Sequence, residues 1–276
     1  MLLSKKSLII EQAALLFAEQ AIETTSIEHI TKQCGISKGA FYLHFKSKDD
    51  LILQIFDHFF KDITARFTVI ETSASSPKQK LHAYVVTFFV MLEEKLPFIS
   101  MYIRQQRTPN EALFDLFTYY NKLIDHATKQ LLVAVYGQQL EGRTLDTLVT
   151  FKGLMRGYSE HILWHRTAYD YNKLATTIVE RLSLIVAQSA TPFLQDDALT
   201  LAPCEEITVE VISEEITLQL KNYPPQSLIY ETLSILQQEL QQAKPRKAII
   251  HGMLATIQTE HDLQWLIFLL NNGKLH

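Results

Sequence analysis

Residues 25–51 read TSIEHITKQCGISKGAFYLHFKSKDDL and contain two short helical patterns joined by a turn. Thr25 and Glu28 have the spacing of a capping box, so we expect the first short helix to begin at Thr25. Ser37 is placed to cap the second short helix, because a serine side chain can accept a backbone N–H there. Gly35 lies between them and tolerates the positive φ that such a turn often needs. The pattern predicts a helix-turn-helix.

The side chains of this segment divide into an inward and an outward set. The expected inward residues are Ile27, Ile30, Ile36, Ala40, Phe41 and Phe45. In a helix-turn-helix the first part of the second helix enters the major groove. There Gly39 leaves room for close approach to bases, while His44 is within reach of phosphates. We predict DNA contacts by Thr25, Ser26, Ser37, Lys38, Gly39, Ala40, Tyr42, His44 and Lys48.

The segment resembles the DNA-binding domain of the TetR/AcrR family of bacterial transcriptional regulators. The resemblance rests on TSIEHI (25–30) and GISKGAFYLHFKSKDDL (35–51), preceded by AALLFAEQ (13–20), and it covers about residues 5–55. It implies three N-terminal helices for DNA, followed by a larger helical domain for ligand binding and dimerisation. It also implies a homodimer on a pseudo-palindromic double-stranded operator, with Lys48 at a phosphate contact. The family pattern does not account for the residues beyond about 200.

The composition of the chain favours an all-α fold. Of 276 residues, 47% are apolar, and Gly and Pro number only eight each, which is too few turn residues for a sandwich or barrel. The net charge is −4, but residues 1–48 hold more basic than acidic side chains, so one end of the chain is suited to phosphate. Cys34 and Cys204 have no metal-like spacing, and no apolar run is long enough for a signal peptide or a membrane span. We expect a cytoplasmic protein without a membrane partner.

Three regions are predicted along the chain. Residues 1–48 form the DNA-binding domain, 49–190 a helical ligand-binding and dimerisation domain, and 191–276 a C-terminal extension of unknown role. Long helices are expected near 47–70, 77–95, 97–106, 109–137, 142–167 and 171–190. In the extension, apolar and polar residues alternate over 207–211 and 216–220, which favours a short β-hairpin over a short helix. Helices follow it. Because the apolar face of 265–270 must be buried somewhere, we expect the extension to be an added dimerisation or pocket-covering element.

Aromatic and methionine side chains are dense between residues 84 and 120. A packed core explains most of them, but a ligand cavity needs some to face a void with a few polar groups nearby. We predict an effector pocket from Phe88, Met91, Phe98, Met101, Tyr102, Arg104, Phe117, Tyr120, His161 and Trp164.

Two spacings in the predicted helix 142–167 suggest further roles. Gly153 and Gly157 lie four residues apart, so another helix can approach closely, either at a dimer interface or within the chain. His161 and His165 also lie four apart, a spacing that can hold a metal on one helix face. A third ligand is not visible, so we predict no metal, no cofactor and no catalytic residue.

The leading hypothesis is a homodimeric, non-enzymatic repressor that a small, largely apolar effector releases from its operator. The helix beginning at Ser47 joins the DNA-binding and effector-binding parts, so an effector could change the separation of the two recognition helices. Two alternatives stay open at this point. One is a helical metal-dependent enzyme that uses His161 and His165. The other is a small-molecule-binding protein without DNA binding.

Overall fold

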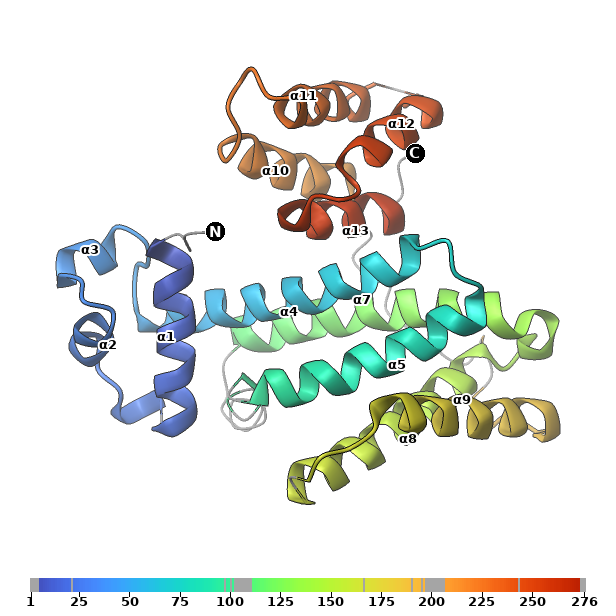
Figure 1. Ribbon diagram of the computed structural model, residues 1–276. Coiled ribbons are helices and arrows are strands. Elements are labelled where there is room, and N and C mark those ends of the chain that lie inside the picture. Colours follow the sequence, from blue (N-terminus) through green and yellow to red (C-terminus); the bar gives the residue numbers. More distant parts are fainter. Residues whose placement is uncertain are drawn as a thin grey trace. The chain divides into compact units, whose positions relative to one another are not determined.

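The computed structural model describes residues 5–20, 22–96, 98–99, 101, 111–165, 167–189, 191–194, 196, 207–242 and 244–273. Within these residues the regular structure is helical and no strand is present, which confirms the predicted all-α class (Figure 1). The chain forms two compact units, one of residues 1–62 and 88–121, the other of 63–87 and 122–276. Three long helices, α4 (Lys48–Thr72), α5 (Pro77–Glu94) and α7 (Glu111–Tyr136), begin in one unit and end in the other.

The first unit contains the N-terminal helices. These are α1 (Lys5–Glu19), the 3₁₀ turn η1 (Ile22–Thr24), α2 (Ile27–Gln33) and α3 (Lys38–Tyr42). Its core is apolar and includes Ile10, Ala14, Phe17, Ile30, Phe41, Phe45, Leu51 and Ile55, each at most 4% exposed. Burial of each large side chain of this kind stabilises the unit by about 1.5–3 kcal/mol. The core therefore holds the short helices α2 and α3, which are too short to be stable alone.

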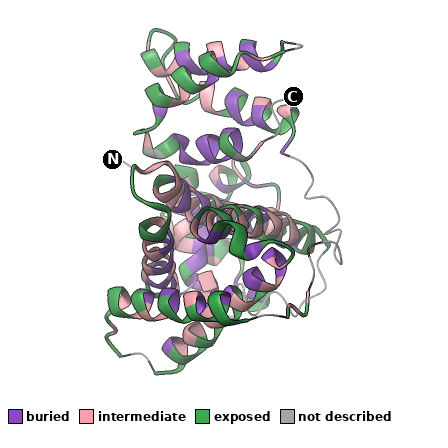
Figure 2. Cartoon of the chain, turned by 90° about the vertical axis from the view of Figure 1, so that its right-hand side faces the viewer, coloured by how far each residue is buried: buried purple, intermediate pink, exposed green. Residues whose placement is uncertain are grey.

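The second unit contains the C-terminal parts of α4 and α7 and the helices that follow. After the 3₁₀ turn η2 (Gly137–Leu140) come α8 (Thr144–His165) and α9 (Tyr171–Gln188), which pack against each other. Ala175, Ile178 and Leu182 form the fully buried stripe of α9. Buried and exposed residues share the turns of most helices, as an amphipathic helix requires (Figure 2). The predicted helices 77–95, 109–137, 142–167 and 171–190 are confirmed to within two residues at each end.

The predicted β-hairpin is wrong, because residues 209–220 form the helix α10 (Val209–Leu220). Its buried apolar positions are Ile212 and Ile216, both fully buried and four residues apart. Val211 and Leu218, which the alternating pattern placed inward, are 36% and 50% exposed. The alternation extended over too few residues to exclude a helical period, and the helix-forming Glu, Gln and Leu content of the segment decides the outcome.

The rest of the C-terminal extension is also helical. It consists of α11 (Leu228–Leu240), α12 (Lys247–Ile257), the 3₁₀ turn η3 (His261–Leu263) and α13 (Gln264–Asn272). Contacts join α10 to α11, α11 to α12 and α10 to α13. The carboxylate of Glu239, only 3% exposed, accepts hydrogen bonds from Arg246 Nε and Nη2 and from its backbone N–H, so the corner between α11 and α12 is fixed. Among the described residues, no helix is long and apolar enough to cross a membrane.

Candidate DNA interface and effector cavity

Serine caps position both helices of the helix-turn-helix. Ser26 Oγ accepts the His29 backbone N–H at 3.1 Å and begins α2, and Ser37 Oγ accepts the Ala40 N–H at 3.1 Å and begins α3. Gly35 lies between them with φ +65°, a backbone conformation that residues with a Cβ rarely adopt. The predicted turn and its glycine are therefore confirmed. The predicted cap Thr25 is wrong by one residue, because Ser26 caps α2.

Most of the predicted DNA-contact residues are accessible on the outer side of this motif. Ser26, Ser37, Lys38, Gly39 and Tyr42 are exposed, whereas Ala40, His44 and Lys48 are half-buried. Phe41 and Phe45 are fully buried, so they hold α3 in place. The exposed set combines hydroxyls, an amine, a phenol and a residue without a side chain, which suits phosphate and base-edge contacts.

Thr25 does not fit its predicted role. Its side chain is fully buried, so it cannot reach a phosphate. The sequence alone could not show this, because the chain turns from η1 into α2 at this residue. We therefore remove Thr25 from the contact set.

Leu43 is an exposed apolar residue that sequence reasoning missed. It is 83% exposed and directly follows the last residue of α3. Its exposure could have been predicted from its position between the inward Phe41 and Phe45, because a residue two places from each lies on the opposite side of a helix. Apolar side chains at such positions can contact thymine methyl groups, so we add Leu43 to the contact set.

Lys48 has a structural role beside the predicted phosphate contact. Its Nζ donates to the backbone carbonyls of Ile22 at 2.9 Å and Thr25 at 3.3 Å. The start of α4 is further fixed by Ser47 Oγ, which accepts the Asp50 N–H at 3.0 Å, while Asp50 Oδ2 accepts the Lys46 N–H at 2.7 Å. Substitution of Lys48 therefore removes the hydrogen bonds that hold the backbone before α2, as well as any phosphate contact.

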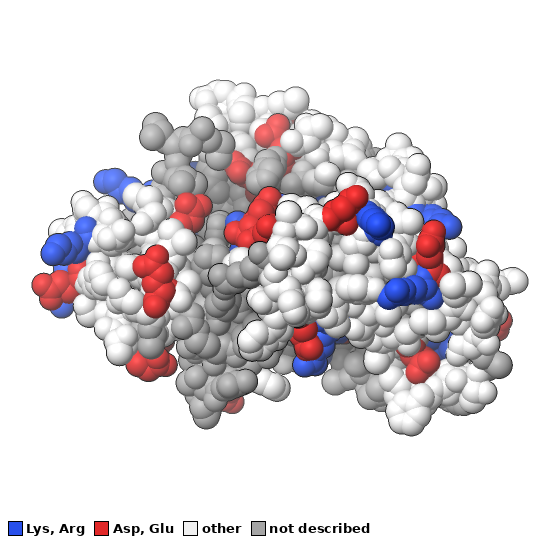
Figure 3. Space-filling model, turned by 60° about the horizontal axis from the view of Figure 1, so that its bottom comes forward, with Lys and Arg blue, Asp and Glu red and all other residues white. Residues whose placement is uncertain are grey.

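The face of the molecule drawn in Figure 3 carries charges of both signs. On the face shown in Figure 3, acidic and basic side chains are interspersed and no wide basic surface is visible. The signal for DNA thus comes from the ordered helix-turn-helix and its exposed side chains more than from bulk charge.

The predicted effector pocket is a packed aromatic cluster instead. Met91, Met101, Phe117 and Tyr120 are buried, and Phe88 and Phe98 are half-buried. Phe98 stacks on Phe59 at 5.1 Å between ring centroids, and Tyr120 stacks on Phe60 at 4.8 Å while its hydroxyl donates to Asp57 at 2.6 Å. These side chains fill space and satisfy one another. Tyr102 and Arg104 lie outside the described residues.

The α8 members of that predicted pocket lie in solvent. Trp164 is 84% exposed and His161 is exposed, so they do not line an enclosed cavity. The rings of His161 and His165 stack at 4.2 Å, and His165 Nδ1 lies 3.0 Å from the His161 carbonyl oxygen. Among the described residues, no group of three or more His, Cys, Asp or Glu side chains is placed to hold a metal. Nothing in these positions favours the metal-dependent enzyme.

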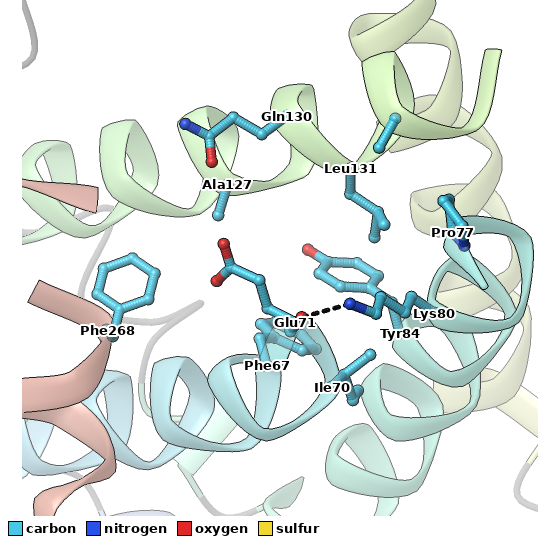
Figure 4. A pocket seen from close by; sticks show the side chains of 11 residues that line it. Phe67, Ile70, Glu71, Pro77, Lys80, Tyr84, Ala127, Gln130, Leu131 and Phe268 are labelled. Carbon is cyan, nitrogen blue, oxygen red and sulfur yellow. Dashed lines mark hydrogen bonds between the residues drawn. The ribbon is translucent and has the colours of Figure 1, made fainter. Parts of the chain in front are cut away.

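A cavity of about 230 Å³ lies in the second unit, among residues of α4, α5, α7 and α13 (Figure 4). Its apolar lining consists of Phe67, Ile70, Pro77, Tyr84, Ala127, Leu131, Ala134 and Phe268. Its polar lining consists of Glu71, Lys80 and Gln130. The sequence-predicted pocket contained none of these residues, because no local pattern tells a cavity wall from an ordinary core position.

One wall of this cavity is a stacked aromatic pair. The rings of Phe67 and Tyr84 lie 4.1 Å apart between centroids with an interplanar angle of 18°. Thr128 donates its hydroxyl proton to the Ile124 carbonyl at 2.7 Å, so the Tyr84 hydroxyl donates to Thr128 Oγ1 at 3.0 Å. Burial raises the pKa of Tyr84 to about 12, so the phenol is neutral. This wall is flat, rigid and uncharged.

Two of the polar groups of the cavity, Glu71 and Lys80, lie where α4 ends and α5 begins, and the third, Gln130, comes from α7. Lys80 Nζ donates to the Glu71 backbone carbonyl at 2.6 Å, which places a cation at the carbonyl end of α4. Figure 4 shows the Glu71 carboxylate between Ala127 and the aromatic wall. A largely apolar cavity with a few polar groups at one side is the usual form of a small-molecule site.

The exposed sides of α8 and α9 contain apolar residues and the two predicted glycines. Gly153 and Gly157 are exposed, and a Cβ added at either would meet nothing within 4 Å. Val149 on α8 is 50% exposed, and Leu184 and Ile185 on α9 are 59% and 40% exposed. The glycines therefore do not serve packing within the described part of the chain.

Comparison with known proteins identifies the N-terminal unit. Residues 9–55 match the family profile described as bacterial regulatory proteins, tetR family. These residues therefore form a TetR-type DNA-binding domain. The chain is 28% identical over 266 residues to YerO of Bacillus subtilis (strain 168), an uncharacterized HTH-type transcriptional regulator, covering 94% of this chain and 91% of YerO. The chain is therefore a DNA-binding transcriptional regulator.

The alignments with known proteins differ in how much of this chain they cover. A solved structure of a transcriptional regulator from Pseudomonas aeruginosa PAO1 has a TM-score of 0.58 and 14% identity, and the match covers 91% of that chain but 67% of this one. This match supports the fold alone. In contrast, an alignment with YerO that covers 94% of the chain must include most of the extension.

A third relative is characterised as a repressor. The HTH-type transcriptional repressor KstR2 of Mycolicibacterium smegmatis is 27% identical over 99 residues, which is 36% of this chain and 48% of KstR2.

Proposed function

We propose that this TetR-family regulator is a repressor that binds a pseudo-palindromic operator as a homodimer and leaves it when a small, largely apolar effector enters the Phe67–Tyr84 cavity. The observation that supports this proposal best is the path of α4. One continuous helix begins beside α3 at Lys48 and contributes Phe67, Ile70 and Glu71 to the cavity. A displacement of α4 by an effector would therefore reach the DNA-binding helices without an intermediate element.

The proposed DNA contacts are the exposed residues around α3. They are Ser26, Ser37, Lys38, Gly39, Ala40, Tyr42, Leu43, His44 and Lys48. Ser37, Lys38 and Gly39 stand at the start of α3, the part of a recognition helix that meets base edges. Tyr42 and Leu43 stand at its end and offer a hydroxyl and an apolar contact.

The proposed dimer interface is the exposed side of α8 and α9. Val149, Leu184 and Ile185 provide apolar area there, and the open surface at Gly153 and Gly157 allows a partner helix to approach closely. A two-fold dimer would present two copies of α3 to successive major grooves. The similarity to the repressor KstR2 supports the repressor role. A dimer that an effector releases from its operator also needs no further component to regulate transcription.

A gel-shift assay with the DNA upstream of this protein's own gene tests the proposal. We expect a discrete complex at nanomolar protein in about 0.15 M salt, competed by unlabelled specific DNA but not by an equal mass of random DNA. Footprinting should reveal two related half-sites. A chain that shows no preference between the upstream fragment and random DNA would contradict the operator-binding proposal.

A further inference from the structure

Helix α13 at the end of the chain is buried on all sides. Six consecutive residues, Trp265 to Leu270, are between 0% and 7% exposed. Consecutive residues of a helix point in all directions around its axis, so covering all six requires neighbours on opposite faces. α13 is therefore held between two surfaces.

One of these surfaces belongs to the C-terminal extension itself. α13 packs on α10, and at its end Gly273 is so close to α10 that an added Cβ would come within 2.8 Å of Ile212 Cδ1. Gln264 is buried, and its side-chain amide donates to the Gln258 and Glu260 carbonyls at 2.8 and 3.0 Å. The extension thus fixes both ends of α13.

The other surface is formed by α4 and α7. Phe268 lines the cavity together with residues of these helices, as Figure 4 shows. Gln258, at the end of α12, also approaches the last residue of α4, with its amide nitrogen 3.4 Å from the Thr72 carbonyl oxygen. Every other residue of the described cavity lies between 67 and 134, so α13 contributes a wall from a distant part of the chain.

We infer that the C-terminal extension completes the effector site, with Phe268 as a specificity-determining residue for a flat, uncharged aromatic ligand of one or two rings. This inference rests on the proposed function for calling that ligand an effector. Phe67, Tyr84 and Phe268 provide aromatic surface, and rings pack favourably against such side chains. The size follows from the volume, because a dry engineered cavity of roughly 150 Å³ holds benzene, and this one measures about 230 Å³.

A ligand in this cavity touches α4 and α13 together. It therefore binds the docked position of α13 more tightly than an undocked one, and it stabilises that docking by its difference in affinity. The extension then serves as part of the sensor, and a regulator shortened before residue 207 would have an open cavity at this position.

Trp265 supplies a direct reporter of the cavity. Its ring stacks on Phe268 with 5.5 Å between centroids and an interplanar angle of 12°. The chain has two tryptophans, and Trp164 is 84% exposed, so a Trp164→Phe background leaves emission from the buried Trp265 alone. Iodobenzene is a suitable probe, because it is apolar, slightly larger than benzene and carries a heavy atom that quenches indole emission at short range. Trp265 is not part of the cavity lining, but it stacks on Phe268, which is.

In that background, iodobenzene should quench Trp265 along a saturable curve. Ala127→Phe fills the cavity and should abolish the saturable part, whereas Val133→Phe adds the same ring to an exposed position of the same helix and should not. Phe268→Leu keeps an apolar side chain at the wall but removes the ring, and it should raise the apparent Kd by about threefold to tenfold. Leu266→Ala, on α13 but outside the cavity lining, is the matched control for destabilised docking and should raise the Kd less than Phe268→Leu does, because the cavity wall keeps its ring.

Two results would overturn the inference. Linear quenching that is equal in Ala127→Phe and Val133→Phe would show that no ligand enters the cavity. Saturable quenching with the same Kd in wild type and Phe268→Leu would show that α13 contributes no specificity. DNA binding is measured apart from this assay, so failure to bind the operator would contradict the proposed function while saturable, Phe268-dependent quenching still supported the site.

Discussion

Helices α3 and α13 use their side chains in opposite ways. α3 has five residues, of which only Phe41 is buried, and its other side chains are accessible. α13 has nine residues, and the first seven, from Gln264 to Leu270, are buried by the chain itself. The surface of α3 is thus available to another molecule, while the surface of α13 is occupied by the fold and by one side of a cavity.

This difference in exposure determines which functional inference the residues of each helix support. The exposed residues of α3 make few contacts within the chain, so their identities reflect what they bind. The residues of α13 are constrained by packing first, so ligand specificity there is confined to Phe268, the residue that faces the cavity. A substitution in one region, followed by measurement of both DNA binding and ligand binding, separates the two.

The largest expected effect comes from Phe41→Ala. Phe41 is fully buried, and its ring lies 5.4 Å between centroids from both Tyr42, in a T-shaped arrangement, and Phe45, in a tilted one. Its removal therefore leaves a cavity under α3. We expect about 3–5 kcal/mol of lost stability in the N-terminal unit and no operator binding at 37 °C. Hydrogen exchange of the two units, with and without the substitution, measures this effect.

The same variant should leave the cavity intact. Iodobenzene quenching of Trp265 in Phe41→Ala should match that of the parent protein. If quenching is lost along with DNA binding, the two regions fold as one and the contrast between α3 and α13 fails.

A smaller effect is expected from the cap of α3. Ser37→Ala removes the acceptor of the Ala40 N–H and should cost about 1 kcal/mol, whereas Ser37→Gly should cost only a few tenths. Thermal unfolding of the N-terminal unit reports the difference. Equal loss with alanine and glycine would mean that the hydroxyl does not cap α3.

Substitution of a glycine on α8 tests whether the exposed side of this helix is a dimer interface. Gly153→Ala meets no neighbour in the chain, so it should stabilise the helix by up to about 1 kcal/mol. If the proposed interface is correct, the added methyl group should also weaken the dimer severalfold in analytical ultracentrifugation. A stabilised chain with an unchanged dimer constant would remove Gly153 from the interface.

The smallest effect concerns pH and the corner between α11 and α12. Hydrogen bonds from Arg246 hold the pKa of Glu239 below its usual range. A carboxylate with a lowered folded-state pKa contributes stability above its unfolded pKa, and that stability is lost as the pH falls through the folded value. Unfolding midpoints between pH 7 and pH 3 should therefore fall more in wild type than in Arg246→Ala, and equal slopes would contradict the assignment.

The parts that the sequence predicted well are those governed by local rules. The turn at Gly35, the cap at Ser37 and the helices α4, α5, α7, α8 and α9 follow from spacing, capping and proline positions, whereas most of the predicted helix 97–106 lies outside the described residues. The predictions were wrong where contacts between residues far apart in the sequence determine which side chains are buried. The short alternation of apolar and polar residues predicted that Val211 and Leu218 are buried, but both are exposed. The spacing of Thr25 and Glu28 predicted that Thr25 caps α2, but Ser26 is the cap.

The effector cavity could not be found from the sequence for the same reason. Its walls come from four helices, and Phe268 is more than 130 residues beyond Leu131. The aromatic density near Phe117 and Tyr120 pointed to a pocket, but Phe117 packs edge to face against Phe56 and Tyr120 stacks on Phe60, so these rings fill their own space. Only three-dimensional packing separates a filled aromatic cluster from an open one.

The most direct test of the central claim is the salt dependence of binding to the upstream DNA, measured by fluorescence anisotropy for wild type, Lys38→Ala and Lys173→Ala. Both lysines are exposed, and each substitution removes one positive charge, but only Lys38 lies on α3. We predict that Lys38→Ala weakens binding about tenfold and lowers the slope of log K against log salt by about 1, while Lys173→Ala matches wild type. Identical curves for the two variants would contradict the assignment of α3 as the DNA-reading helix.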